Sequence, residues 1–183
     1  MKQLFTLLLA AMFLTCSYAQ AQEEEKSLGL EDIFQSGKLY PRGVRGIRSM
    51  NDGEHFTQIK RDSINAYSYK TGELTGVIVT SDELIPAGDT TPISLYNYTF
   101  SNDESKILFA DETESIYRRS SKSFFYVYDR ETKSLTPVSD NGKQQLAAFS
   151  PDNSKVAFVR ENNIFIRNLN EGPEIQITFD GED

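Results

Sequence analysis

A turn followed by alternating strands recurs about every 50 residues, and this repeat constrains the fold more than any other feature of the sequence. Three segments open with a turn rich in Asn, Asp and Ser, at Asn51–Gly53, Asn102–Ser105 and Pro151–Ser154. A short run rich in apolar residues then follows a lysine, for example at Lys106–Phe109 and Lys155–Val159, and is interpreted as a strand. A short apolar run of this kind, bounded by turn residues, is typical of a β-strand.

Each later segment continues with a second strand, at Phe125–Tyr128 and Asn163–Ile166, and then with a polar turn and a third strand. Several short strands in each period indicate β-propeller blades, which stack because one blade cannot cover its own apolar faces. The sequence therefore predicts an all-β fold of about three blades. Since closure takes roughly four to eight blades, we expect an incomplete β-propeller that is a fragment of a longer protein. A complete β-sandwich, whose strands are also regularly spaced, is the alternative.

The first 21 residues have the layout of a secretory signal peptide. Lys2 precedes an apolar run from Leu4 to Leu14, and small residues follow at Ala19 and Ala21. We expect cleavage after Ala21. A lipoprotein signal that ends at Cys16 is the alternative.

These features divide the chain into a signal peptide (1–21), a lead-in segment (22–45) and a partial propeller (46–183). The lead-in segment is expected to hold no more than a short helical turn or a loop, within Ser27–Leu39. The signal peptide predicts an exported protein that is periplasmic, associated with the outer membrane or secreted.

The composition speaks against several classes of partner and cofactor. The formal net charge is −8 and becomes −9 when Lys2 leaves with the signal peptide, so no basic stripe is available for nucleic acid. Cys16 is the only cysteine, so the mature chain would have no disulfide and no thiolate metal site. No Cys/His metal spacing and no phosphate-loop motif occurs. We therefore expect no cofactor and no metal.

Residues that could carry catalysis are scarce. His55, the only histidine, follows a turn and is expected to be a surface or strand-end residue. No G-x-S-x-G nucleophile motif occurs in the sequence. Asp103 and Asp152 lie in turns, where their carboxylates are expected to bond to the backbone. No catalytic residue is predicted in this chain.

Arg118 and Arg119 stand just before the aromatic strand, in a stretch (residues 110–123) that makes the second segment longer than the third. Such an insertion extends from a strand connection, where functional groups are often displayed. A guanidinium offers five donors in a rigid fork and suits a carbonyl or carboxylate oxygen of a ligand. The alternative is that both arginines pair on the surface with the neighbouring acids Asp111, Glu112 and Glu114.

Two stretches in this order resemble the N-terminal β-propeller of the dipeptidyl peptidase IV family, in the prolyl oligopeptidase clan. They are Y-R-R-S at Tyr117–Ser120 and S-P-D-x-x-K-V-A-F-V at Ser150–Val159, followed by ITFDGED at Ile177–Asp183. The second stretch alone is a general propeller motif, whereas the two at this spacing are more specific. The resemblance covers about Leu28 to Asp183 and fits a bacterial exported member.

The resemblance implies a serine exopeptidase that releases N-terminal dipeptides with proline, or sometimes alanine, as the second residue. An eight-bladed propeller would cap a C-terminal α/β-hydrolase domain, with the active site in the cavity between them. Arg118 matches the family arginine that holds a backbone carbonyl of the bound peptide. Arg119 has no such role, and Tyr117 and Ser120 would support the local loop. The partners implied are such peptides, the hydrolase domain and a second copy in a homodimer.

The glutamate pair and the catalytic Ser, Asp and His of the family are missing from this sequence. Glu182-Asp183 lacks the aromatic residues that flank the glutamate pair. We therefore expect the chain alone to be inactive and its part in the full-length enzyme to be substrate gating and positioning. The alternatives are a freestanding secreted propeller-like binding module and a β-sandwich with a structural role in the envelope. Since an open blade leaves apolar faces uncovered, the mature fragment is expected to be poorly soluble or oligomeric.

Overall fold

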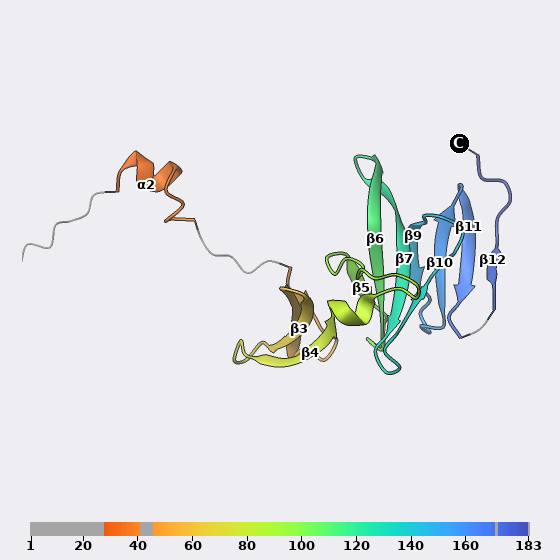
Figure 1. Cartoon of the computed structure of the whole chain (residues 1–183), viewed down its shortest axis with the longest axis horizontal. Helices are drawn as coiled ribbons and strands as arrows, with labels where there is room; N and C mark the ends of the chain where they lie inside the picture. Colours follow the sequence, from red (N-terminus) through yellow and green to blue (C-terminus); the bar gives the residue numbers. More distant parts are fainter. Residues whose placement is uncertain (1–27, 41–45, 171, 183) are drawn as a thin grey trace, which may run out of the picture. The chain divides into compact units, whose positions relative to one another are not determined.

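The computed structural model describes residues 28–40, 46–170 and 172–182 (Figure 1). The predicted signal peptide, residues 1–21, lies outside the described residues. The chain divides into two compact units, residues 1–43 and 44–183. The described part of the first unit contains one helix, α2 (Leu30–Phe34), where the sequence predicted a short helical turn or a loop. Nowhere in the described ranges is a helix long and apolar enough to span a bilayer.

The second unit contains three antiparallel sheets, each made of four strands that follow one another in the chain. Sheet 1 comprises β1 (Arg48–Ser49), β2 (His55–Lys60), β3 (Ser63–Ser68) and β4 (Leu74–Thr80). Sheet 2 comprises β5 (Tyr98–Phe100), β6 (Lys106–Tyr117), β7 (Ser120–Asp129) and β8 (Ser134–Pro137). Sheet 3 comprises β9 (Gln145–Phe149), β10 (Lys155–Arg160), β11 (Asn163–Asn168) and β12 (Glu174–Gln176). A short 3-10 helix, η1 (Ser81–Leu84), follows β4.

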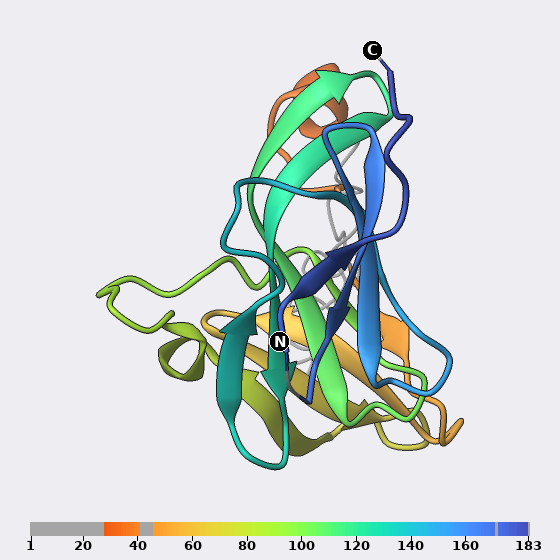
Figure 2. The same ribbon diagram turned by 90° about the vertical axis from the view of Figure 1, so that its right-hand side faces the viewer.

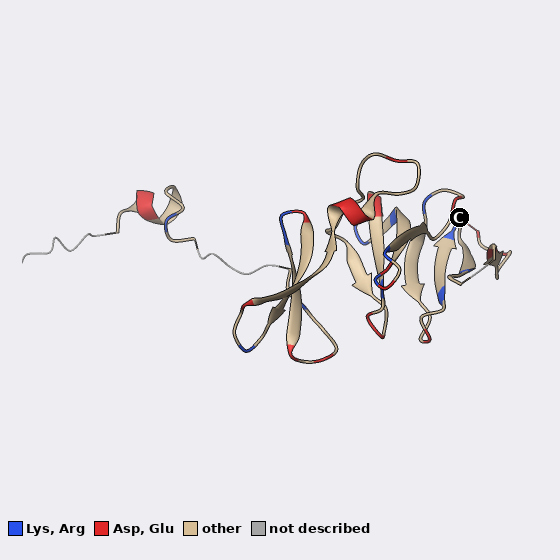
Figure 3. Ribbon diagram, turned by 60° about the horizontal axis from the view of Figure 1, so that its bottom comes forward, with Lys and Arg blue, Asp and Glu red and all other residues tan. Residues whose placement is uncertain are grey.

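The turns that open each repeat are held by an aspartate, as the sequence predicted for two of them. Asp103 Oδ1 accepts hydrogen bonds from the backbone N–H of Ser105 and from the Ser101 hydroxyl. Asp152 Oδ1 does the same with Ser154 and Ser150. These bonds stabilise the carboxylates and hold the pKa of Asp103 well below its usual range. Figure 3 shows acidic residues at many of these strand-connecting turns and in η1.

Sheet 2 is buried on both faces, because alternate residues of its central strands belong to two different cores. Ile107 and Phe109 of β6 pack with Tyr128 of β7 in a cluster that includes side chains of sheet 1. The intervening Leu108 and the neighbouring Val127 pack in a second cluster with residues of sheet 3. Because successive side chains of a strand point to opposite faces, sheet 2 contributes apolar side chains to the core on each side of it. Figure 2 gives a second view of the three sheets.

Face-to-face packing of consecutive four-stranded meanders is the arrangement of propeller blades. The predicted all-β fold with about three blades is confirmed.

Candidate functional site

The two central strands of sheet 2 are longer than their equivalents in sheet 3 and form an extended hairpin. β6 has 12 residues and β7 has 10, whereas β10 and β11 have 6 each. Pairing continues as far as Tyr117 opposite Ser120, so Arg118 and Arg119 occupy the two-residue turn at the tip. The stretch interpreted as an insertion is therefore a continuation of both strands. Its tip is at the upper end of β6 in Figure 1.

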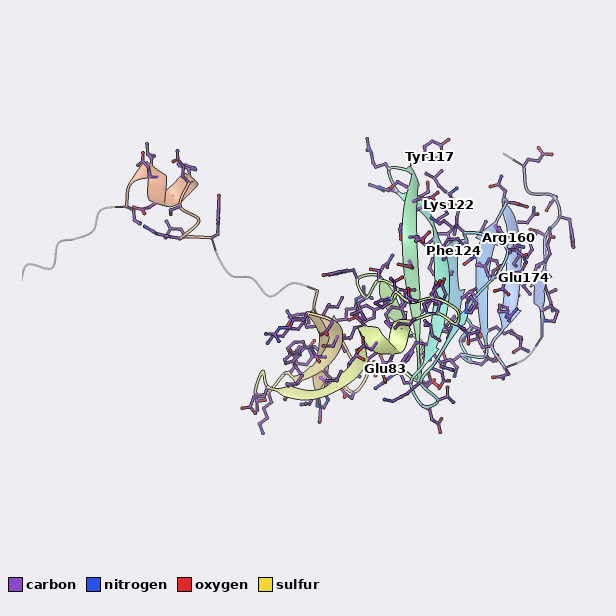
Figure 4. All side chains as sticks on the ribbon, viewed as in Figure 1. Glu83, Tyr117, Lys122, Phe124, Arg160 and Glu174 are labelled. Atoms are coloured by element: carbon purple, nitrogen blue, oxygen red, sulfur yellow. The ribbon has the colours of Figure 1, made fainter. Side chains whose placement is uncertain are left out.

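The tip of this hairpin is exposed. Tyr117 is 81% exposed, and Figure 4 shows it at the far end of β6. Arg118 and Arg119 are also exposed. Among the residues that the structure describes, neither guanidinium forms an ion pair. Both arginine side chains are thus accessible to solvent or to a ligand at the tip of the hairpin.

The acids near the tip are paired elsewhere, so the alternative of surface pairing with the arginines is wrong. Asp111 Oδ1 accepts a hydrogen bond from the backbone N–H of Ser94 at 3.1 Å. Glu114 lies 3.2 Å from Lys122 Nζ and 2.6 Å from Lys143 Nζ. The hydrogen bonds from Lys143 and then Lys122 lower the pKa of Glu114. Lys122 of β7 and Lys143 of the connection before β9 therefore reach the Glu114 carboxylate, and the two arginines at the turn do not.

A segment of the next repeat bonds to the hairpin along β7. Ser123 and Gln144 exchange two backbone hydrogen bonds, at 2.9 and 2.8 Å. The side chain of Gln144, which is fully buried, also accepts the backbone N–H of Phe125 at 3.1 Å. The Thr113 and Ser123 hydroxyls lie 2.8 Å apart across the hairpin. The connection that leads to β9 therefore anchors β7 at Ser123.

The structure also contains a half-buried ionic cluster that sequence reasoning missed. Arg160 lies 2.6 Å from the carboxylate of Glu174, and both side chains are less than 15% exposed. The Ser139 hydroxyl and the Asn141 amide donate to the same carboxylate. The contact with Arg160, followed by these hydrogen bonds, lowers the pKa of Glu174 to about 2. Figure 4 places Arg160 and Glu174 within sheet 3, away from the tip, so we assign this cluster to folding.

A groove of about 690 Å³ lies between sheets 1 and 2. Glu83 and Lys133, which lie 2.7 Å apart, and the buried Tyr128 contribute to its walls. Burial, and then the charge of Glu83, raise the pKa of Tyr128 to about 12. No residue of the hairpin tip lines this groove.

His55 begins β2, as predicted, and its Nδ1 lies 2.7 Å from Asp52 Oδ2. This contact joins the turn to the strand. It gives His55 a structural role, and no catalytic role is needed to account for the residue. Within the ranges that the structure describes, no group of His, Cys, Asp and Glu has the arrangement of a metal site.

The fold and the hairpin define the class of protein: three consecutive blades of a β-propeller, the middle blade carrying a long hairpin with an arginine pair at its tip. Residues 101–183 match the family model of the "Dipeptidyl peptidase IV (DPP IV) N-terminal region". The matched residues include the whole hairpin and all of sheet 3.

Individual relatives agree with this match. A probable dipeptidyl peptidase 4 of Arthroderma benhamiae is 30% identical over 160 residues, which are 85% of this chain and 19% of that protein. A probable dipeptidyl-aminopeptidase B of Botryotinia fuckeliana is 36% identical over 94 residues, 50% of this chain and 10% of that protein. The crystal structure of Porphyromonas gingivalis dipeptidyl peptidase 4 superposes with a TM-score of 0.67 and 38% identity, over 86% of this chain and 22% of the other.

Residues 101–183 are therefore similar to the N-terminal region of the dipeptidyl peptidase IV family, and the resemblance seen in the sequence is confirmed. The chain spans about a fifth or less of the length of the curated relatives that it matches.

Proposed function

We propose that this chain is the substrate-positioning part of an exported serine dipeptidyl peptidase that releases X-Pro and X-Ala dipeptides from peptide N-termini. The bond-breaking groups would belong to a C-terminal hydrolase domain outside this sequence. The relatives named as dipeptidyl peptidases support the reaction class.

The observation that carries the proposal is Arg118, which is exposed at the tip of an anchored hairpin and forms no ion pair within the described ranges of the chain. A guanidinium without a protein partner can offer its fork of donors to a carbonyl oxygen of a peptide. Its contribution is orientation, because holding the peptide backbone in register brings the scissile bond to the catalytic groups. In this proposal Arg118 binds substrate and Arg119 does not.

The test is steady-state kinetics of the full-length protein with an X-Pro chromogenic substrate, for Arg118→Ala and for the matched control Arg119→Ala. A hydrogen bond to a charged group is worth about 1.5–3 kcal/mol, so Arg118→Ala should lower kcat/KM by roughly 10- to 100-fold. Arg119→Ala should stay within about twofold of the parent. Arg118→Lys should recover only part of the loss, since an ammonium lacks the planar fork.

Unchanged kinetics for Arg118→Ala, with an unchanged thermal midpoint, would overturn the role of Arg118. Full-length protein that binds peptides but does not hydrolyse them would overturn the peptidase assignment and favour a freestanding binding module.

A further inference from the structure

Lys143 links the hairpin to the next repeat through several contacts at one point. It lies in the connection between β8 and β9, and its side chain is only 13% exposed. Its Nζ donates to the backbone carbonyl of Glu112 and to Glu114 Oε1, each at 2.6 Å. The carboxylate of Glu112 lies 3.5 Å away, and the ring of Phe124 packs 5.1 Å from Nζ. One lysine thus contacts both strands of the hairpin.

The contact point coincides with an irregularity in β6. The pairing register shifts between Asp111 and Glu114, and Glu112 has a φ of 46°, in the left-handed region. Such a bulge bends a strand and changes the direction of the residues beyond it. A non-glycine residue keeps this conformation only when its surroundings hold it there. The bond from Lys143 to the Glu112 carbonyl is such a restraint.

We propose that Lys143 is a positioning residue that sets the direction of the β6–β7 hairpin and thereby places Arg118 for substrate. The inference rests on the substrate-binding role proposed for Arg118. Gln144 bonds to Ser123 of β7, opposite the bulge, whereas Lys143 bonds to the bulge itself in β6, beyond which the chain continues to the tip. The restraint comes from the following repeat, so it orients the hairpin relative to sheet 3.

The chain offers a matched control in Lys122, which also pairs with Glu114, at 3.2 Å. Lys122 belongs to β7, so its ion pair lies within the hairpin and cannot orient the hairpin relative to sheet 3. Lys143→Met and Lys122→Met each remove one ammonium from the same carboxylate. Only the first removes a link between the hairpin and the connection that leads to sheet 3.

The experiment uses the full-length protein and measures kcat, KM, the thermal midpoint and the rate of trypsin cleavage after Arg118 and Arg119. Lys143→Met should lower kcat/KM several-fold, mainly through KM, and should speed cleavage at the tip. Lys122→Met should change each by less than about twofold. Lys143→Arg should restore most of the loss, because it keeps a charged donor at the bulge. In an Arg118→Ala background, Lys143→Met should have little further effect on kcat/KM.

Equal behaviour of Lys143→Met and Lys122→Met would overturn the inference, even if Arg118→Ala is strongly impaired. So would an undiminished effect of Lys143→Met in the Arg118→Ala background, since Lys143 would then act elsewhere. If Arg118→Ala alone has no effect, the proposed function fails instead, and the trypsin rate decides whether Lys143 orders the hairpin. Should Lys143→Met lower the thermal midpoint strongly, Glu114→Gln weakens the same link from the other side, and unchanged cleavage and KM there would also overturn it.

Discussion

The backbone N–H of Asn102 donates to Oδ1 of Asn153 at 2.9 Å, and so joins the opening turns of two successive repeats. The same bond occurs one repeat earlier, where the N–H of Asn51 donates to Glu104 Oε1 at 2.7 Å. In both cases the first residue of one turn donates to the third residue of the next. Pro151 holds the donor position of the third turn and has no N–H. The repeat is therefore visible in the contacts between sheets as well as in the strands.

Asn153→Ala should destabilise the propeller by about 1–2 kcal/mol, because it removes this acceptor. It also places an alanine at a φ of 58°, a left-handed conformation that asparagine adopts more readily because its side chain can bond to the local backbone. Asn153→Gly removes the acceptor but tolerates the backbone conformation, so its loss should be smaller. Thermal unfolding of the full-length protein measures both. Equal midpoints for Asn153→Ala and the parent would contradict the expectation.

Tyr98→Phe should cost about 1–2 kcal/mol. The Tyr98 hydroxyl lies 2.9 Å from Thr57 Oγ1, and both side chains are buried between sheets 1 and 2. Losing one partner leaves a buried hydroxyl poorly satisfied, whereas replacing both partners by apolar groups is close to neutral. The double variant Thr57→Val/Tyr98→Phe should therefore be more stable than Tyr98→Phe alone. Chemical denaturation of all variants checks this, and strictly additive losses would refute it.

The ion pair of Glu174 and Arg160 should make stability depend on pH in the acid range. The folded-state pKa of Glu174 is lowered from 4.5 to about 2, so its stabilisation is complete above the unfolded value and is lost as pH falls from about 5 towards 2. The contribution is of the order of 3 kcal/mol at neutral pH. Glu174→Gln lacks it, so the difference in unfolding free energy from the parent should shrink over this window. A difference that stays constant from pH 7 to pH 3 would rule out this linkage.

The chain from Gln22 to Asp183, expressed alone, should self-associate. Ile164 and Ile175 of sheet 3, and Ile177 directly after β12, are 43–58% exposed. Ile166 lies directly opposite Ile175 across the strand pair. Uncovered apolar sheet faces of this kind drive association. Ile164→Asp/Ile175→Glu should raise the monomer fraction in sedimentation velocity. Leu30→Asp, in the short helix α2, is the control and should not. A monodisperse parent chain would contradict the prediction.

Local sequence determined the strands and the turns of this protein. The apolar runs after Lys106 and Lys155 predicted β6 and β10, because a strand face that packs against a neighbouring sheet must be apolar. The aspartates of the turns were also predictable from local sequence, because a turn carboxylate bonds to N–H groups only two or three residues away. The stretches Tyr117–Ser120 and Ser150–Val159 indicated the family whose model residues 101–183 match, but they did not predict that Arg118 and Arg119 form the turn of a continuous hairpin.

Tertiary structure decided which charges meet. Sequence proximity favoured pairing of the acids at 111–114 with Arg118 and Arg119. Instead, strand pairing places the arginines at the turn, while Lys122 of β7 and Lys143 of the connection before β9 lie beside the acids. Lys143 is about 30 residues from its partners and comes from another repeat, so no local pattern indicates the contact. Periodicity follows from the chain's own geometry, whereas an ion pair between repeats forms only after the sheets have packed.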